Sequence, residues 1–139
     1  MIKKIIIILL VTVLLYAVVN HKFITAVIYL QDNNLANDTK AVKLLEEAVK
    51  EDKDRKSAFL LGYYYKIEKY KAIDMTKSHK YYVIASDLGD NEAKMLVAWN
   101  YYKGIGCSQN INQSKSLLTQ LAIDGNSKAK EVLKFVIMH

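Results

Sequence analysis

Few side chains in this 139-residue chain are of the types that perform chemistry, and their spacing does not bring them together. The histidines are His21, His79 and His139, and no two of them have the interval that metal ligands on one helix would need. Cys107 is the only cysteine, so no internal disulfide forms, and we interpret it as a small buried hydrophobic residue rather than a nucleophile. The sequence contains neither a nucleophile elbow nor a phosphate-binding loop. We therefore expect no catalytic residue, no metal ligand and no cofactor, and hence no enzyme.

The charged residues are mixed along the chain and do not form a basic patch. Lysines and arginines number 20 against 14 acidic residues, which gives a net charge of +6, and half of this excess comes from Lys3, Lys4 and Lys22. In the remainder, basic and acidic residues are interspersed, which argues against a nucleic-acid partner. Hydrophobic residues make up 52% of the chain, so it is not a disordered tail, and the absence of proline favours uninterrupted helices.

The N-terminal arm has the composition of a targeting or anchoring segment. Residues 5–19 follow two lysines and are interrupted only by Thr12 and Tyr16. These fifteen residues would rise about 22 Å as a helix, less than the roughly 30 Å of a bilayer core, but the apolar pattern resumes over residues 23–30. We therefore predict that residues 1–30 form a transmembrane anchor, or uncleaved signal, helix that contacts the membrane through residues 2–19. A cleaved signal peptide remains the alternative.

The flanking charges predict how this anchor is oriented. Lys3, Lys4 and the free amino group outweigh Lys22 on the other side, and the side richer in basic residues stays in the cytoplasm. We therefore expect a single-pass protein of the bacterial inner membrane, with its N-terminus in the cytoplasm and the remaining domain in the periplasm.

The rest of the chain repeats with a period of 36 residues. Ser57, Ala93 and Ala129 occupy equivalent positions, and the match continues from them without gaps. Within each unit a first helical pattern is followed by a second that ends at a glycine, Gly89 or Gly125. The repeating object is a helical hairpin, which must stack on its neighbours to bury its apolar face.

Residues 93–129 resemble a Sel1-like repeat, a relative of the tetratricopeptide repeat. The unit before it, residues 57–92, is similar to the same motif but has Glu68 and Tyr70 where the family has glycine, so we expect a reshaped turn there. The residues that carry the resemblance in the second unit are Val97, Ala98, Tyr101, Lys103, Gly104, Ile105, Gly106, Cys107, Ser114, Leu117, Ala122, Gly125 and Ala129.

The resemblance implies an all-α fold, a right-handed α–α solenoid of helical hairpins with an N-terminal hydrophobic helix. Residues 23–30 would supply the first helix that an incomplete first unit lacks. The repeat domain would span residues 31–139, with a half-unit at 37–56, units at 57–92 and 93–128, and a terminal helix at 129–139.

Sel1-like repeat proteins act, as a family, as adaptors that assemble other proteins. Small bacterial members include periplasmic immunity proteins that neutralise antibacterial effectors, phospholipases among them. The resemblance thus implies a non-enzymatic protein-binding module, with a membrane-anchored periplasmic immunity protein that binds a secreted effector as the leading hypothesis. A general envelope adaptor or assembly factor for a membrane protein complex is the alternative. A branch of the family linked to β-lactam binding is rich in disulfides, and a chain with one cysteine does not resemble it.

In stacked two-helix repeats the first helices line the concave face, where we expect a protein partner to bind. With Leu61 and Tyr65 turned inward, two stripes of apolar, aromatic and cationic side chains remain on these helices. Such residues are common in the hot spots of protein interfaces. The alternative, in which Tyr63 or Trp99 packs between neighbouring hairpins, stays open. The predicted partner-binding residues are Leu60, Tyr63, Tyr64, Lys66, Ile67, Leu96, Trp99, Asn100, Tyr102 and Lys103.

Overall fold

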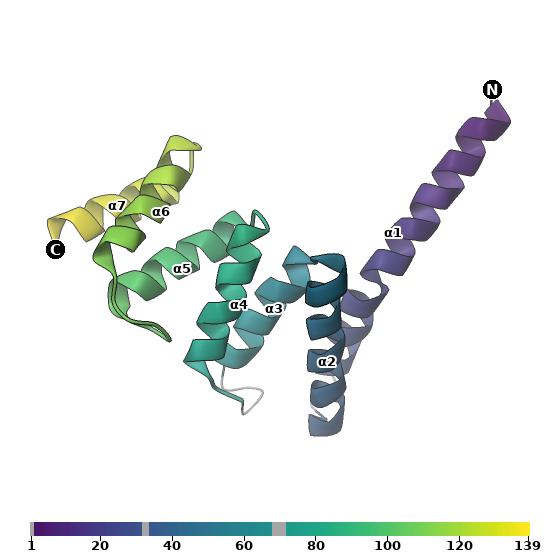
Figure 1. Cartoon of the computed structure of the whole chain (residues 1–139), viewed down its shortest axis with the longest axis horizontal. Coiled ribbons are helices and arrows are strands. Elements are labelled where there is room, and N and C mark those ends of the chain that lie inside the picture. The colour runs from purple at the N-terminus through teal and green to yellow at the C-terminus, as the bar shows by residue number, and fades with distance from the viewer. Residues whose placement is uncertain (1, 32–33, 68–71) are drawn as a thin grey trace. The chain divides into compact units, whose positions relative to one another are not determined.

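Every regular element that the computed structural model describes is an α-helix, which confirms the all-α prediction (Figure 1). The structure describes residues 2–31, 34–67 and 72–139, and within the first helix it describes side chains only for residues 5–14 and 21–31. Two compact units follow each other along the chain, one ending at Lys53 and one running from Asp54 to His139. The helices are α1 (Ile2–Gln31), α2 (Leu35–Asp52), α3 (Arg55–Lys66), α4 (Met75–Asp87), α5 (Asn91–Lys103), α6 (Ile111–Ile123) and α7 (Ser127–Met138).

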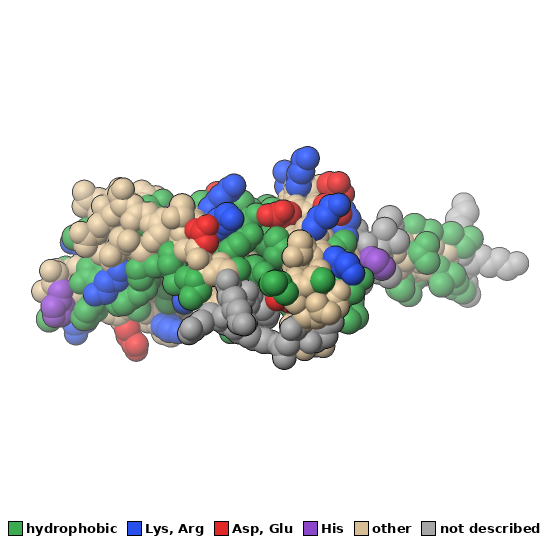
Figure 2. Space-filling view, turned by 90° about the horizontal axis from the view of Figure 1, so that it is seen from below, with side chains coloured by type: hydrophobic (Ala, Val, Ile, Leu, Met, Phe, Trp, Pro, Cys, Tyr) green, Lys and Arg blue, Asp and Glu red, His purple; other side chains and the backbone are tan. Residues whose placement is uncertain are grey.

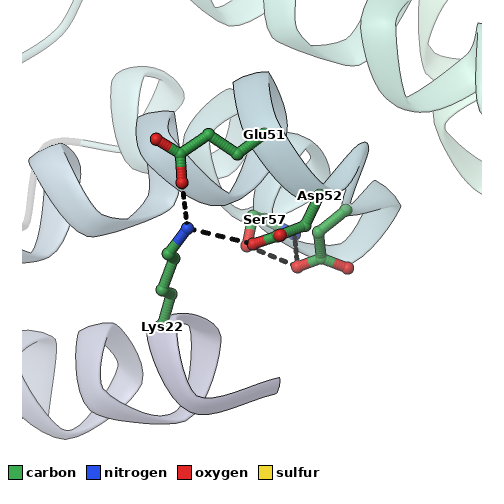
Figure 3. Close-up of polar contacts among 5 residues, drawn as sticks. Lys22, Glu51, Asp52 and Ser57 are labelled. Carbon is green, nitrogen blue, oxygen red and sulfur yellow. Dashed lines mark hydrogen bonds and ion pairs between the residues drawn. The ribbon is translucent and has the colours of Figure 1, made fainter. Parts of the chain in front are cut away.

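The first unit is a helical hairpin in which the second half of α1 packs against α2. Asn34 caps α2 by accepting a hydrogen bond from the backbone N–H of Ala36 (3.0 Å). Beside the buried face, the Lys22 ammonium contacts the carboxylates of Glu51 and, at 3.2 Å, Asp52, as Figure 3 shows. The hydrogen bond to Glu51 and the neighbouring charges raise the pKa of Lys22. The apolar residues that become buried in this hairpin are Ala26, Leu30, Ala41, Leu45 and Ala48.

The first half of α1 exposes its apolar side chains. The prediction that it is a membrane anchor is nevertheless wrong. From Ile5 to Leu14 the large hydrophobic residues are at least half exposed, and Figure 2 shows them along this helix. In the part of the chain that the structure describes, no helix has both the length and the apolar character needed to cross a membrane. A span takes about 20 mostly apolar residues, and the run over residues 5–19 ends after fifteen at Asn20, His21 and Lys22. This corrects the single-pass topology with a cytoplasmic N-terminus and a periplasmic repeat domain, and the membrane contact through residues 2–19.

The helices of the second unit repeat the 36-residue interval found in the sequence. The first helices of successive repeats, α3, α5 and α7, begin at intervals of 36 residues, and so do the second helices, α4 and α6. We call these first-type and second-type helices, and they alternate along the unit (Figure 1). Each start is fixed by an Asp or Asn whose side chain accepts hydrogen bonds from the free N–H groups of the first turn. These caps are Asp54, Asp74, Asp90, Asn110 and Asn126. The Asp54 carboxylate also accepts a hydrogen bond from the Ser57 hydroxyl, which Figure 3 draws as a dashed line.

Small residues on the first helices let the second helices approach closely. An added Cβ at Gly62 in α3 would lie 2.7 Å from Cδ1 of Tyr82 in α4, so only glycine fits against that ring. The equivalent pair one unit later is Ala98 and Leu118, where a smaller second-helix residue leaves room for a methyl group. The last core cluster of the unit consists of Ala98, Leu118, Leu121, Ala129 and Val136, which joins α7 to α5 and α6.

The turn between α5 and α6 is held close to the start of α4 by a glycine. Gly106 has φ +68°, and a Cβ there would lie 1.9 Å from the carbonyl oxygen of Met75, so both conformation and space require glycine. The equivalent turn of the preceding unit, with the reshaping predicted at Glu68 and Tyr70, lies outside the described residues.

Candidate functional site

The predicted partner-binding residues on α3 divide into exposed and buried ones. Tyr63 is 44% exposed and Lys66 is exposed, so both are available to a partner, whereas Leu60 and Ile67 are half-buried. Tyr64 is buried, with its ring in edge-to-face contact with Tyr65 (centroids 5.2 Å apart). It therefore supports the helix from inside.

On α5 the prediction divides in the same way. Trp99, Tyr102 and Leu96 are half-buried, and Lys103 is exposed. Asn100 is buried, and its side-chain amide lies 3.3 Å from Nδ1 of His79 in α4. Asn100 therefore ties α5 to α4 and does not face solvent.

Lys103 covers two of the predicted aromatic residues. Its ammonium lies 5.2 Å from the centroid of the Trp99 ring and 4.8 Å from that of Tyr102. Both distances are within the range of cation–π attraction, which holds the charge over the ring faces. The stripe that the sequence predicted on α5 is thus one contiguous group of Trp99, Tyr102 and Lys103.

The structure adds two rings from α7 and the following residue to this group. Phe135 lies 6.4 Å from Trp99 and 5.9 Å from Tyr102 between ring centroids, and the His139 ring stacks on Phe135 at 4.5 Å. Trp99 and Tyr102 are themselves 5.6 Å apart. We call these four rings together with Lys103 the C-terminal aromatic cluster. Apart from His139, its members come from two consecutive first-type helices, so the repeat itself brings them together.

A groove of about 270 Å³ opens between α5 and α7 at this cluster. The residues that line it are Trp99, Glu131, Val132 and Phe135. Phe135 remains 42% exposed, so the groove is open to solvent on its aromatic side. Figure 2 shows apolar side chains beside lysine and histidine side chains at this C-terminal end of the unit.

The sequence analysis missed Val132 and Phe135, although the period contained the signal. Phe135 follows Trp99 by 36 residues, just as Trp99 follows Tyr63, so the three first-type helices carry an aromatic residue at one equivalent position. The sequence prediction ends the repeat match at Ala129 and assigns residues 129–139 to a terminal helix.

His79 and Cys107, two residue types that could perform chemistry, are buried and half-buried, respectively. Burial lowers the pKa of His79 and raises the pKa of the Cys107 thiol, so at neutral pH the first is held uncharged and the second stays protonated. Within the described ranges, no group of three or more His, Cys, Asp or Glu side chains is arranged to hold a metal ion. What remains is an aromatic surface with a cation on it.

Solved structures similar to this one are Sel1 repeat proteins. A Sel1 repeat protein from Oxalobacter formigenes is 29% identical, with a TM-score of 0.69 over 84% of this chain and 87% of the other. A protective antigen present in uropathogenic Escherichia coli strains, which displays an SLR fold, is 30% identical, with a TM-score of 0.63 over 70% of this chain. This chain spans about a fifth (21%) of the length of the E. coli protein. No family model and no curated protein matches the chain. Fold and sequence similarity together support the Sel1-like repeat family.

Proposed function

We propose, from the likeness to Sel1 repeat proteins, that this chain is a non-enzymatic protein-binding module whose partner contacts the face formed by α3, α5 and α7. The observation that carries the proposal is the C-terminal aromatic cluster, in which Trp99, Tyr102 and Phe135 remain partly accessible around a groove. A few hot-spot residues dominate the binding energy of protein interfaces, and Trp and Tyr are enriched among them.

The surface that would take part extends beyond the cluster along the first-type helices. Tyr64 and Asn100 support this surface from inside, because both are buried. The remaining predicted residues that are at least partly accessible are Leu60, Tyr63, Lys66, Ile67, Leu96, Trp99, Tyr102 and Lys103.

The finer proposal is that the partner is a secreted antibacterial effector and that the chain is its immunity protein. The support for this is the resemblance to small Sel1-like immunity proteins, together with a site that has binding residues and no reactive group. A phospholipase is one effector class that such proteins neutralise. The alternative is an adaptor that assembles several resident proteins into one complex.

Co-expression with a candidate secreted effector, chosen from the neighbouring genes, tests the proposal. We expect the full chain to restore growth and to co-purify with the effector at fixed stoichiometry, and we expect the double variant Trp99→Ala/Tyr102→Ala to lose both effects. Ile123→Ala is the matched control, because Ile123 is an apolar residue that is 80% exposed on the second-type helix α6. Protection by the double variant equal to that of the unchanged chain would contradict the proposed face. Capture of several resident proteins without any protective effect would favour the adaptor.

A further inference from the structure

We infer that the groove between α5 and α7 binds an acidic segment of a protein partner, which packs one large apolar side chain against Trp99, Val132 and Phe135. This inference rests on the proposed function and specifies the chemistry of the partner. It follows from the size of the groove, the nature of its walls and the charges around it.

The groove has room for an anchoring side chain and little more. Its volume of about 270 Å³ lies below the roughly 300–1,000 Å³ of pockets that enclose drug-sized molecules. Two aromatic rings and the branched side chain of Val132 form its walls, so an apolar occupant would be buried against apolar surface. A single Phe, Leu or Met side chain from a protein segment therefore suits the groove better than a free small molecule.

Two lysines flank the residues that line the groove. Lys103 lies one turn after Trp99 on α5 and Lys128 lies one turn before Val132 on α7; both are exposed, and the one acidic residue beside them is Glu131. Among the residues that the structure describes, neither of these two lysines forms an ion pair. An acidic segment would neutralise charges that are unpaired in the free protein, and complementary charge both speeds encounter and selects the partner.

The charged residues next to the two rings differ in sign, which orients the segment. Lys103 lies one turn after Trp99 in α5, whereas Glu131 lies one turn before Phe135 in α7. The cation–π contacts already hold the Lys103 ammonium above the rings of the cluster, so little side-chain freedom is lost when a carboxylate pairs with it. Carboxylates of the segment should therefore lie on the Lys103 side of the anchor, away from Glu131.

Trp99 gives a direct measurement, because it is the only tryptophan in the chain. The probes are three synthetic peptides added to the full chain: a central Phe followed by glutamates, the same peptide with Ala in place of Phe, and the same peptide with lysines in place of glutamates. We expect only the first to produce a saturable shift of Trp99 emission, and we expect its binding to weaken with added salt.

Two substitutions and two matched controls locate the binding. Phe135→Ala and Lys103→Glu should each weaken the binding of the first peptide at least tenfold. Ile123→Ala, at an exposed apolar residue of α6, and Lys56→Glu, at an exposed basic residue of α3, should leave the binding of this peptide unchanged. Lys103→Glu changes a surface residue, so its folded state can be verified by circular dichroism before its binding is compared.

Three results would overturn the inference. They are equal or tighter binding of the lysine peptide, equal binding of the peptide without Phe, and a dissociation constant above about 1 mM for all three peptides. Protection of cells through Trp99 and Tyr102 in the co-expression experiment would stand in each of these cases, so failure of the acidic-anchor inference is separable from failure of the proposed function.

Discussion

His79 is a histidine held away from water between two helices. Its side chain is 8% exposed, its ring meets Tyr101 edge-to-face at 5.0 Å, and Nδ1 lies 3.3 Å from the amide nitrogen of Asn100. The Asn100 amide can donate to Nδ1 only while the ring is neutral, because both nitrogens of a charged imidazole are donors. Burial correspondingly lowers the pKa of His79.

This lowered pKa predicts that the protein loses stability in mild acid. Between the folded-state pKa of His79 and the ordinary value near 6.5, the unfolded chain binds more protons than the folded one, so the free energy of unfolding falls as the pH falls through 6.5. Thermal melts at pH 7.5 and pH 5 should show a lower Tm in acid, and His79→Gln should reduce that difference. His21→Gln, an exposed histidine of the other unit, is the control. An acid effect of the same size in His79→Gln would contradict the assignment.

At the scale of the helical hairpin, the approach of α4 to α3 depends on the pair Gly62 and Tyr82. Tyr82 is 2% exposed, and burial raises the pKa of its hydroxyl to about 12. Nearby, the Ser78 hydroxyl donates to the carbonyl oxygen of Gly62 at 2.7 Å, so the two helices are also joined by a buried hydrogen bond. The hairpin is therefore closely packed at this crossing.

Gly62→Ala should destabilise the protein by about 1–3 kcal/mol. Alanine favours a helix over glycine by about 1 kcal/mol, but the new methyl group would lie within 3 Å of the Tyr82 ring. In a Tyr82→Leu background the same change should cost less, because that pair reproduces Ala98 and Leu118 of the next unit. Urea unfolding of the two single variants and the double variant gives the coupling energy. Equal costs of Gly62→Ala in both backgrounds would show that the crossing is not controlled by this contact.

Much of this hairpin architecture could be predicted from the sequence. The period, the glycines that end the second helices and the Asp and Asn residues before each helix are local signals, and the structure places helix starts at the same 36-residue interval. Burial around a helix is set by its neighbours and not by its own pattern. α5 packs against both α4 and α6, which buries Asn100 along with Ala93, Val97 and Ala98.

The N-terminal arm and the groove could not be predicted correctly from the sequence. Composition alone suggested an anchor for residues 1–30, and the described residues contain no helix that meets the length and hydropathy of a span. The groove depends on Phe135, whose distance from Trp99 becomes visible only once α7 is stacked on the unit before it.

At the scale of the whole molecule, the chain divides into two compact units, Met1–Lys53 and Asp54–His139. The second contains its own caps and the cluster that joins α5, α6 and α7. In repeat proteins, stability is close to a sum over units and the interfaces between neighbours. The second unit should therefore hold its structure without the first.

Residues 54–139 expressed alone should give a helical circular dichroism spectrum, a cooperative thermal transition and the Trp99 emission of the full chain. A fragment that stops at residue 110 would lack α6 and α7 and with them the partners of Ala98, so it should unfold without a clear transition. If the longer fragment also melts without cooperativity, the two units depend on each other for folding.

The position on each first-type helix that contacts the second-type helix of its hairpin, Gly62 in α3, also limits how the series of repeats can be lengthened by design. Gly62 in α3 and Ala98 in α5 are followed, another 36 residues on, by Lys134 in α7, which is exposed. A helix laid on α7 as α4 lies on α3 would meet a long charged side chain where its predecessors meet hydrogen or a methyl group. An engineer who grafts a further hairpin after α7 would first have to replace Lys134 with alanine or glycine.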